Sequence, residues 1–292
     1  MRVSDSVINR LVEQRLSRSR ERTAEAFERV STGLRVNQPS DDPLASALGR
    51  RTTREASRAK LLSRSVTTGL SRLQVADSAL NEASGILARA RELAVMGATE
   101  TANADNRAMI AREVATLRDA LISLGNTKSS SGYVFAGYND DAPPFDAAGT
   151  YSGDGNVREL EVSTGLRIAE GVSGARVFGI GSGTDIMQVM QDLRAALEGD
   201  DVGGVQATLD RLEAGHDQVQ QARGELGNSV NLFEGARAAL ERVHDRSVAE
   251  RAELTEADVM QAFSQLAKAE QALQVAVAVA SRLPLPGLVG GD

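Results

Sequence analysis

Two long stripes of apolar residues at seven-residue spacing constrain the fold of this 292-residue chain more than any other feature. The first lies within residues 44–98 and occupies both seam positions of about four successive heptads. Its members are Val66, Leu73, Leu80, Leu87 and Ala94 at one position, and Leu62, Ala76, Ala83 and Ala90 at the other, where Gly69 is the weak point. The second contains Val205, Leu212, Val219, Leu226, Phe233, Leu240 and Leu254, with Ser247 as its polar member. Each pattern predicts a long helix, and the two helices are expected to pack together as an antiparallel, coiled-coil-like rod.

The apolar pattern is interrupted between the two stripes in a way that predicts further helices. Residues 97–106 are small and polar, and the pattern resumes from Ile110 to Leu124, so residues 62–124 are expected to form a helical hairpin. Gly125 and Asn126 both tolerate the left-handed conformation and predict its end. A further helix is expected from Ile186, with Thr184 or Asp185 as its N-cap.

Residues 133–183 differ in composition, because they hold ten of the 27 glycines and two of the six prolines. Four short segments rich in β-forming residues lie between the turn residues. They are Tyr133–Ala136, Val157–Val162, Leu166–Ile168 and Ala175–Phe178. This region is therefore predicted to be a small β-rich insertion at one end of the rod.

Two helix interruptions bracket the predicted rod. At the first, Gly33 is expected to end a helix, and Asp42 is placed to cap the next helix with Pro43 at its first position. At the second, Thr255 is a predicted N-cap and Asp258 the third helical residue, with Leu254 packing on Val259 as a hydrophobic staple. We call these two interruptions the joints.

The pattern as a whole predicts a mainly α chain with paired terminal helices, organised in three regions. Residues 1–42 with 255–292 are expected to form a terminal helical domain, and residues 43–132 with 184–254 the rod. Residues 133–183 form the β-rich domain.

The two terminal segments, about residues 3–32 and 256–283, each carry one apolar stripe. The stripes are Val3, Val7 and Leu11 in the first, and Val259, Phe263, Leu266, Leu273, Val277 and Ala280 in the second. A lone helix of this kind is marginal in water, and a lone pair buries little surface. Two interpretations stay open: the segments fold back onto the rod, or they become ordered only against neighbouring subunits. The run of small apolar residues at 272–280 favours the second, because such a run is an aggregation hazard when exposed, although burial within the same chain also accounts for it.

Composition excludes several classes of function. The net charge of −7, the 3% aromatic content and the absence of Trp argue against nucleic-acid binding. The absence of Cys excludes disulfides and thiolate chemistry. Residues 1–64 carry 14 basic and eight acidic residues, and the eight acids favour a solvated helix face over a transit peptide. The sequence contains neither the apolar core of a secretory signal near Met1 nor an apolar run of about 18 residues, so no membrane insertion is expected.

The residues offer little basis for catalysis. His216 lies on the apolar seam and His244 beside Asp245 and Arg246, so packing and solvation account for both better than metal ligation. Asp41 and Asp42 at a helix start are explained by capping and by the helix dipole. Residues 151–156 lack the spacing of a complete calcium loop, and no HExxH motif is present. No enzyme activity, cofactor or metal is therefore expected.

Three stretches carry a resemblance to a known family. Residues 29–37 (RVSTGLRVN) followed by Ser40, Asp41 and Asp42 resemble the N-terminal signature of bacterial flagellins and their relatives. Residues 254–273 resemble the C-terminal motif of the same superfamily. The prolines at 39 and 43, and the YVFAG stretch at 133–137, resemble the hook–filament junction members more than the filament flagellins. The resemblance covers roughly residues 1–140 and 240–283, and the β-rich insertion matches in placement alone.

The resemblance implies a structural subunit of the flagellum that forms a layer between hook and filament. Its implied partners are copies of itself, the hook-side junction protein, flagellin and a cytoplasmic export chaperone. It would be exported unfolded, without a cleaved signal peptide, to the extracellular flagellum, where the terminal helices form an inner tube. The expected assembly residues are Val3, Val7, Leu11, Phe263, Leu266, Leu273, Val277 and Ala280. The expected joint motif is Gly33, Arg35, Asn37, Pro39, Ser40, Asp41, Asp42 and Pro43.

One departure from the family concerns the C-terminus. Pro284, Pro286 and the neighbouring glycines are expected to stop the last helix near Arg282, where family members commonly continue as an apolar helix. Filament flagellin is the nearest alternative, and a soluble coiled-coil adaptor is the alternative from another class.

Overall fold

The computed structural model describes residues 2–99, 102–163 and 165–281. The chain divides into two compact units, Met1–Arg58 with Val243–Asp292 (unit 1) and Ala59–Arg242 (unit 2). This division falls inside two long helices and does not separate the β-rich region, so the three-region organisation stays a prediction.

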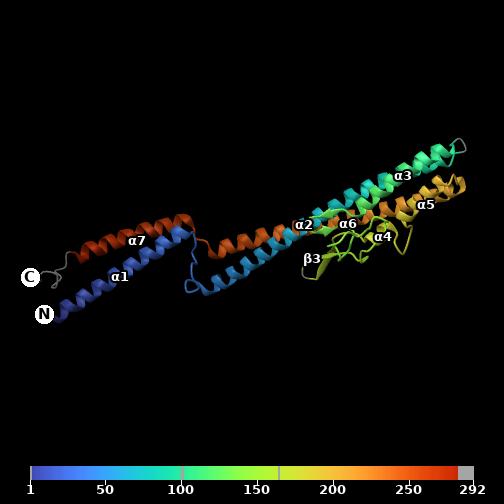
Figure 1. Cartoon of the computed structure of the whole chain (residues 1–292). Helices are drawn as coiled ribbons and strands as arrows, with labels where there is room; N and C mark the ends of the chain where they lie inside the picture. The colour runs from blue at the N-terminus through green and yellow to red at the C-terminus, as the bar shows by residue number, and fades with distance from the viewer. Residues whose placement is uncertain (1, 100–101, 164, 282–292) are drawn as a thin grey trace, which may run out of the picture. The chain divides into compact units, whose positions relative to one another are not determined.

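The chain is mainly α-helical, as predicted (Figure 1). The helices are α1 (Arg2–Thr32), α2 (Pro43–Gly97), α3 (Ala104–Gly125), α4 (Gly174–Phe178), α5 (Ile186–Glu198), α6 (Val202–Thr255) and α7 (Val259–Ala280). The strands are β1 (Lys128–Ser129), β2 (Gly132–Tyr133), β3 (Glu159–Ser163) and β4 (Leu166–Ala169).

The core of unit 2 is built on the two predicted heptad stripes. Every member of the α2 stripe from Val66 to Ala94 is buried, and so is the α6 stripe from Val205 to Phe233. Ion pairs cross between these helices on the surface, from Arg223 to Asp77 at 3.0 Å and from Arg91 to Glu213 at 2.9 Å. Because the α6 partner number falls as the α2 number rises, the two helices run antiparallel. Helices α3 and α5 lie side by side and add their apolar faces to the same core (Figure 1).

Gly69, the weak point of the predicted α2 seam, makes room for an aromatic ring. A Cβ atom on Gly69 would lie 2.6 Å from Cε1 of Phe233, which is fully buried. Real Cβ atoms do not approach another carbon so closely. The glycine therefore accommodates the largest member of the α6 stripe.

Helix ends in unit 2 follow the sequence signals, with one difference. Asp185 caps α5 by accepting a hydrogen bond from the N–H of Gln188 at 3.0 Å. Helix α3 ends at Gly125 as predicted, but Asn126 has φ −96° and is not left-handed. Its amide group instead exchanges two hydrogen bonds with the backbone of Phe145, at 2.8 and 2.9 Å. A long-range contact therefore sets the conformation that the local signal did not predict.

The β-rich region contains two small antiparallel sheets, β1–β2 and β3–β4. The predicted strands at 157–162 and 166–168 correspond to β3 and β4, whereas of 133–136 only Tyr133 is in a strand. The strand predicted at Ala175–Phe178 is wrong, because these residues form α4. Ser173 caps this helix by accepting from the N–H of Arg176, and Gly179 ends it with φ +77°. Local capping outweighed β propensity here.

An aromatic cluster supplies the packing that such short strands cannot. The ring of Phe178 makes edge contacts with Phe135 at 5.7 Å and with Phe145 at 4.9 Å between centroids, and Phe145 contacts Tyr151 at 5.2 Å. Edge-to-face pairs of this kind are favourable beyond their area of burial. The few aromatic residues of the chain are therefore concentrated where the secondary structure is weakest.

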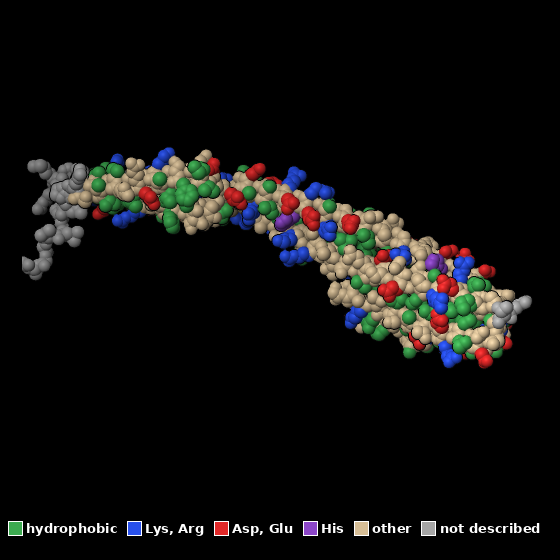
Figure 2. Space-filling view, turned by 90° about the horizontal axis from the view of Figure 1, so that it is seen from above, with side chains coloured by type: hydrophobic (Ala, Val, Ile, Leu, Met, Phe, Trp, Pro, Cys, Tyr) green, Lys and Arg blue, Asp and Glu red, His purple; other side chains and the backbone are tan. Residues whose placement is uncertain are grey.

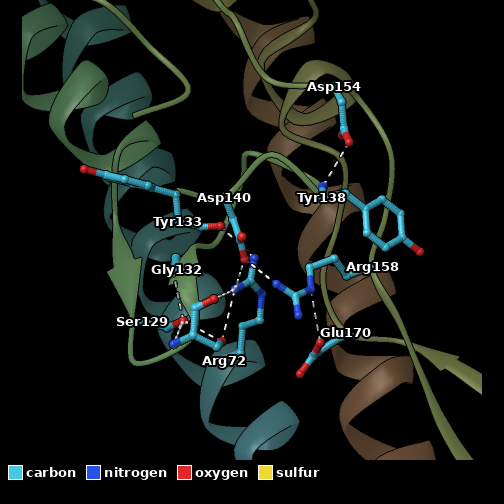
Figure 3. A network of polar contacts seen from close by, with 10 residues as sticks. Arg72, Ser129, Gly132, Tyr133, Tyr138, Asp140, Asp154, Arg158 and Glu170 are labelled. Carbon is cyan, nitrogen blue, oxygen red and sulfur yellow. Dashed lines mark hydrogen bonds and ion pairs between the residues drawn. The ribbon is translucent and has the colours of Figure 1, made fainter. Parts of the chain in front are cut away.

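Arg72 of α2 is the centre of a buried polar network that ties the β-rich region to the helices (Figure 3). Its side chain is 2% exposed and donates to the carbonyl of Tyr133 at 2.6 Å and to the hydroxyl of Ser131 at 3.2 Å. Asp140 lies 3.6 Å from the Arg72 guanidinium and also pairs with Arg158. Burial is the main cause that lowers the pKa of Arg72 below its usual range, and Asp140 and Glu170 oppose it. The network satisfies a charge that would be costly to bury alone.

We predict that Gly69→Ala destabilises the protein by about 1–3 kcal/mol, because the new methyl group overpacks against Phe233. Gly85→Ala is the matched control in the same helix, since a Cβ there meets nothing within 4 Å. This control should leave the free energy of unfolding unchanged or raise it by up to about 1 kcal/mol. Urea unfolding of both variants measures the difference, and equal stabilities would contradict the role given to Gly69.

We predict that Arg72→Met destabilises unit 2 by about 3–5 kcal/mol, because it leaves buried carbonyl and carboxylate groups without their partner. Arg89→Met removes an exposed arginine of α2 that pairs with Glu92 and Glu113, and should cost less than about 1 kcal/mol. Urea unfolding followed by circular dichroism tests both. A cost for Arg72→Met no larger than for Arg89→Met would contradict the network's contribution to stability.

Candidate functional site: the paired joints and terminal helices

The two joints are hydrogen-bonded to each other in unit 1. Residues 33–36 and 255–257 form a short antiparallel bridge, with Leu34 opposite Glu256. The N–H groups of Arg35 and Val36 donate to the carbonyl of Thr255 at 2.8 and 3.3 Å. The N–H of Ala257 donates to the carbonyl of Gly33 at 2.9 Å. The backbone therefore fixes the point at which both terminal helices leave the joints.

Gly33 allows the chain to enter this bridge. Its N–H donates to the carbonyl of Arg29 at 2.9 Å and closes the last turn of α1, and its φ is +69°. An L-residue rarely adopts this conformation, whereas glycine adopts it without a steric penalty. The prediction that Gly33 ends the first helix is confirmed.

The Arg35 side chain connects both joints to the start of α2. It donates to the carbonyl of Leu254 at 2.7 Å and to the carboxylate of Asp42 at 3.2 Å. Carbonyl groups at a helix end lack partners within the helix, so a guanidinium is well suited to satisfy one of them. Arg35 is thus the side chain of the predicted motif that reaches across to the second joint.

Asp41 and Asp42 order the turn between Arg35 and α2. Asp42 caps α2 by accepting from the N–H of Ala45 at 2.9 Å, and this bond is the main cause that lowers its pKa. Asp41 accepts from the N–H groups of Asn37 and Gln38, each at 3.0 Å, and the bond from Gln38 is the main cause that lowers its pKa. Capping and turn formation therefore account for both carboxylates, as the sequence indicated.

The three remaining motif positions differ from one another. Pro43 occupies the first position of α2, where the missing N–H costs nothing. Pro39 and Ser40 are exposed at the turn. Their role as junction-specific residues stays a proposal.

The second joint differs from the prediction. Helix α6 runs through Thr255, whose hydroxyl donates back to the carbonyl of Arg251 at 2.8 Å instead of capping a new helix. Asp258 is the N-cap of α7 and accepts from the N–H of Gln261 at 3.1 Å. Val259 is exposed, and no hydrophobic staple is evident between the residues described here. The pairing of Thr255 with Arg35 and Val36 fixes the backbone so that the cap lies three residues later.

Helices α1 and α7 pack against each other as an antiparallel pair (Figure 1). Thr23 contacts the carbonyl of Ala269 at 3.3 Å and Arg29 contacts Gln265 at 3.4 Å. In both helices, the side chains that are less exposed than their neighbours repeat at spacings of four and three residues. They are Val12, Leu16, Ser19, Thr23, Ala26 and Val30 in α1, and Ala262, Leu266, Ala269, Leu273, Ala276 and Ala280 in α7. This is a heptad seam, and it confirms the predicted pairing of the terminal helices.

The predicted assembly residues separate into two groups on this pair. Leu266, Leu273 and Ala280 lie in the seam between α1 and α7. Val7, Leu11, Phe263 and Val277 lie outside it and are exposed, with Phe263 at 56%. The side chain of Val3 lies outside those that the structure describes. The stripe of Val7 and Leu11 misses the seam because repeated steps of four drift around a helix of 3.6 residues per turn.

Helix α7 ends at Ala280 with Ser281 as its C-cap, close to the predicted stop. The proline- and glycine-containing tail after it lies outside the described residues. Val275, Val277 and Val279 of the small apolar run are exposed on α7. The run is therefore helical here, and three of its valines face away from α1.

Groups of chemical interest elsewhere have structural partners. His216 lies beside Ser84 at 3.5 Å in unit 2, and His244 contacts the carbonyl of Ala56 at 3.1 Å in unit 1. His244 is half-buried, so the solvated position expected for it is wrong. Within the described ranges there is no cluster of three or more potential metal ligands. Across the same residues, no helix has the length and apolarity to cross a membrane.

Comparison with known proteins matches residues 3–140 to the family described as bacterial flagellin N-terminal helical region. Flagellar hook-associated protein 3 of Escherichia coli is 27% identical over 231 residues, which cover 71% of this chain and 73% of that protein. The Salmonella typhimurium protein of the same name is 31% identical over 153 residues, covering 52% of this chain and 48% of its own length. Flagellin A of Vibrio cholerae is 33% identical over 107 residues, covering 37% and 28%. The chain is thus similar to flagellar hook-associated proteins over most of its length and to flagellins over a shorter part.

Solved structures share the fold. The flagellar hook associated protein-3 from Legionella pneumophila matches with a TM-score of 0.62 at 17% identity, covering 70% of this chain and 98% of that one. The FlgL protein of Xanthomonas campestris matches with a TM-score of 0.60 at 19% identity, covering 70% and 99%. About 70% of this chain therefore shares its fold with these flagellar proteins.

We predict that Asp42→Ala lowers stability at neutral pH through loss of the cap of α2. A carboxyl whose pKa is lowered by folding stabilises above its unfolded pKa, near 3.9, and this stabilisation is lost as the pH falls through the folded pKa. The melting temperature of Asp42→Ala should therefore fall less between pH 5 and pH 2 than that of the parent chain. Asp42→Asn keeps a capping oxygen and should retain most of the stability at pH 7 while losing the same pH dependence. An unchanged acid profile in both variants would contradict this account.

Proposed function

We propose that this chain is the structural subunit that forms the junction layer between hook and filament of a bacterial flagellum. The hook-associated relatives support this assignment, since the Escherichia coli protein matches over 71% of this chain. The joint geometry carries the mechanism, because it holds two terminal helices together and leaves a second set of apolar residues exposed on them. Neighbouring subunits cover those residues during assembly.

The exposed residues form the proposed assembly surface: Val7 and Leu11 on α1, and Phe263, Val275, Val277 and Val279 on α7. An exposed apolar surface of this kind marks an interaction site, because water disfavours it in an isolated chain. Leu266, Leu273 and Ala280 contribute indirectly by pairing α7 with α1. Folding of the terminal pair and its burial against neighbours are then coupled.

The proposed partners are further copies of the chain, the hook-side junction protein, flagellin and an export chaperone. The chain would leave the cell unfolded and without a cleaved signal peptide, and would fold at the extracellular flagellum. The absence of Cys is compatible with passage between compartments of different redox potential.

Filament flagellin is the second candidate, because flagellins also match parts of the chain. Immunogold labelling of intact cells and sheared flagella separates the two functions. A single labelled position between hook and filament supports the junction role, whereas label along the filament would overturn it.

A soluble coiled-coil adaptor is the alternative from another class. It requires termini that stay ordered in the free chain. Limited proteolysis of the purified protein is expected to remove about 40 residues at each end if those helices are marginally stable until assembly. Complete resistance at both ends would favour the adaptor.

We predict that Phe263→Asp with Val277→Asp prevents incorporation into flagella while leaving the folded chain intact. Both side chains are exposed, so the free energy of unfolding should change by less than about 0.5 kcal/mol. Gln271→Asp, on the polar side of α7, is the matched control and should assemble normally. Complementation of a strain that lacks the gene, read as swimming and gold label, measures assembly. Normal assembly of the double variant would refute the proposed surface.

A further inference from the structure

An acid-rimmed apolar groove lies on unit 2. It has a volume of about 730 Å³ and runs between α2 and α6. Leu87 and Leu212 form its buried floor, and Val95 and Met96 are half exposed at its edge. Exposed apolar side chains are visible among charged ones on the face shown in Figure 2.

The rim of this groove carries a net negative charge. Glu92, Glu213 and Asp217 line it, against the single cation Arg91. Glu213 is paired with Arg91 at 2.9 Å and Glu92 with Arg89 at 3.0 Å. Asp217 has no ion-pair partner within the part of the chain that the structure describes. The groove is thus suited to an apolar side chain flanked by cations.

The same helix carries a patch of that chemistry. Leu61 of α2 is 63% exposed and lies between Lys60 and Arg64, which are also exposed. Neither cation has an ion-pair partner among the described residues. The two positive charges are complementary to the groove rim, where Asp217 carries a carboxylate without an ion pair among the described residues. We call Lys60, Leu61 and Arg64 the basic patch.

The basic patch cannot fill the groove of its own chain. The patch lies near residue 62 of α2, and the α2 side of the groove lies near residue 92. This separation of 30 residues corresponds to about 45 Å along a helix. We infer that the groove of one subunit receives the basic patch of a second copy of this chain. This rests on the proposed function, in which copies lie side by side in one layer.

The contact joins two different surfaces, so it leaves an unused groove and an unused patch on every pair. Such a contact adds further copies in one direction and forms a row, whereas an isologous contact stops at a dimer. Opposite charges at the rim fix the register of neighbours more than they add affinity. The inference therefore names a second interface, separate from the one made by the terminal helices.

Cysteine cross-linking tests this interface directly, because the chain has no Cys of its own. Leu61→Cys and Val95→Cys in one chain place a thiol in the patch and another in the groove. In flagella sheared from cells that produce this variant alone, mild oxidation should give a ladder of dimers, trimers and larger species. Leu61→Cys with Leu232→Cys is the control, since Leu232 is exposed to a similar degree on α6 but lies outside the groove.

Charge reversal separates recognition from chance proximity. Adding Lys60→Glu and Arg64→Glu to the cross-linking variant should lower the yield about tenfold or more, because like charges then face each other. Adding Glu92→Lys and Asp217→Lys as well should restore it. Circular dichroism checks that each variant is folded.

The outcomes are distinguishable from failure of the proposed function. Normal gold label at the junction with no ladder, or with dimers alone, would overturn this inference and leave the junction role intact. Absence of the parent chain from the junction would instead refute the proposed function. A ladder that the charge reversals do not change would overturn the recognition by charge.

Discussion

The backbone hydrogen bonds between residues 33–36 and 255–257 determine the arrangement of the chain ends in unit 1. They join two segments that are more than 200 residues apart in the sequence. Because the bridge is antiparallel, α1 and α7 leave it in the same direction and meet along a single heptad seam. Arg35 strengthens the bridge by joining the end of α6 to the start of α2. The register of the terminal pair, and with it the set of apolar residues left exposed, follows from this contact.

The sequence predicted those features that depend on local signals. The α2 and α6 stripes predicted long helices because a heptad repeats the same local requirement many times. Asp42, Asp185 and Gly33 predicted helix ends because a cap depends on a few neighbouring atoms. The seam of α1 was missed because it contains Ser19 and Thr23, so a search for large apolar side chains did not detect its four-and-three spacing. A pattern of four-and-three spacing that admits small residues as well as large apolar ones predicts the α1 seam.

Other features depended on contacts between distant residues and could not be predicted locally. The pairing of the joints is one, and the position of the α7 cap at Asp258 follows from it. Gly69 is another, since only the structure brings the ring of Phe233 to it. The helix at Gly174–Phe178 contains the β-forming residues Val177 and Phe178, but the Ser173 cap and the Gly179 stop that define it flank the predicted strand at 175–178. The Arg72 network likewise joins α2 to a loop about 60 residues later, and the sequence offers no spacing by which to find it.

The distribution of apolar residues on the terminal pair agrees with a helix pair that is completed by assembly. The seam between α1 and α7 contains many small side chains, such as Ala26, Ala262 and Ala269, so its burial per turn is modest. The larger side chains, Phe27 and Phe263, are exposed. The seam also holds Leu16, Leu266 and Leu273, but the exposed phenylalanines leave apolar surface whose burial would stabilise the pair further. A neighbour that covers these phenylalanines would therefore add apolar burial to that of the intramolecular seam, and this addition favours the assembled state over the free chain.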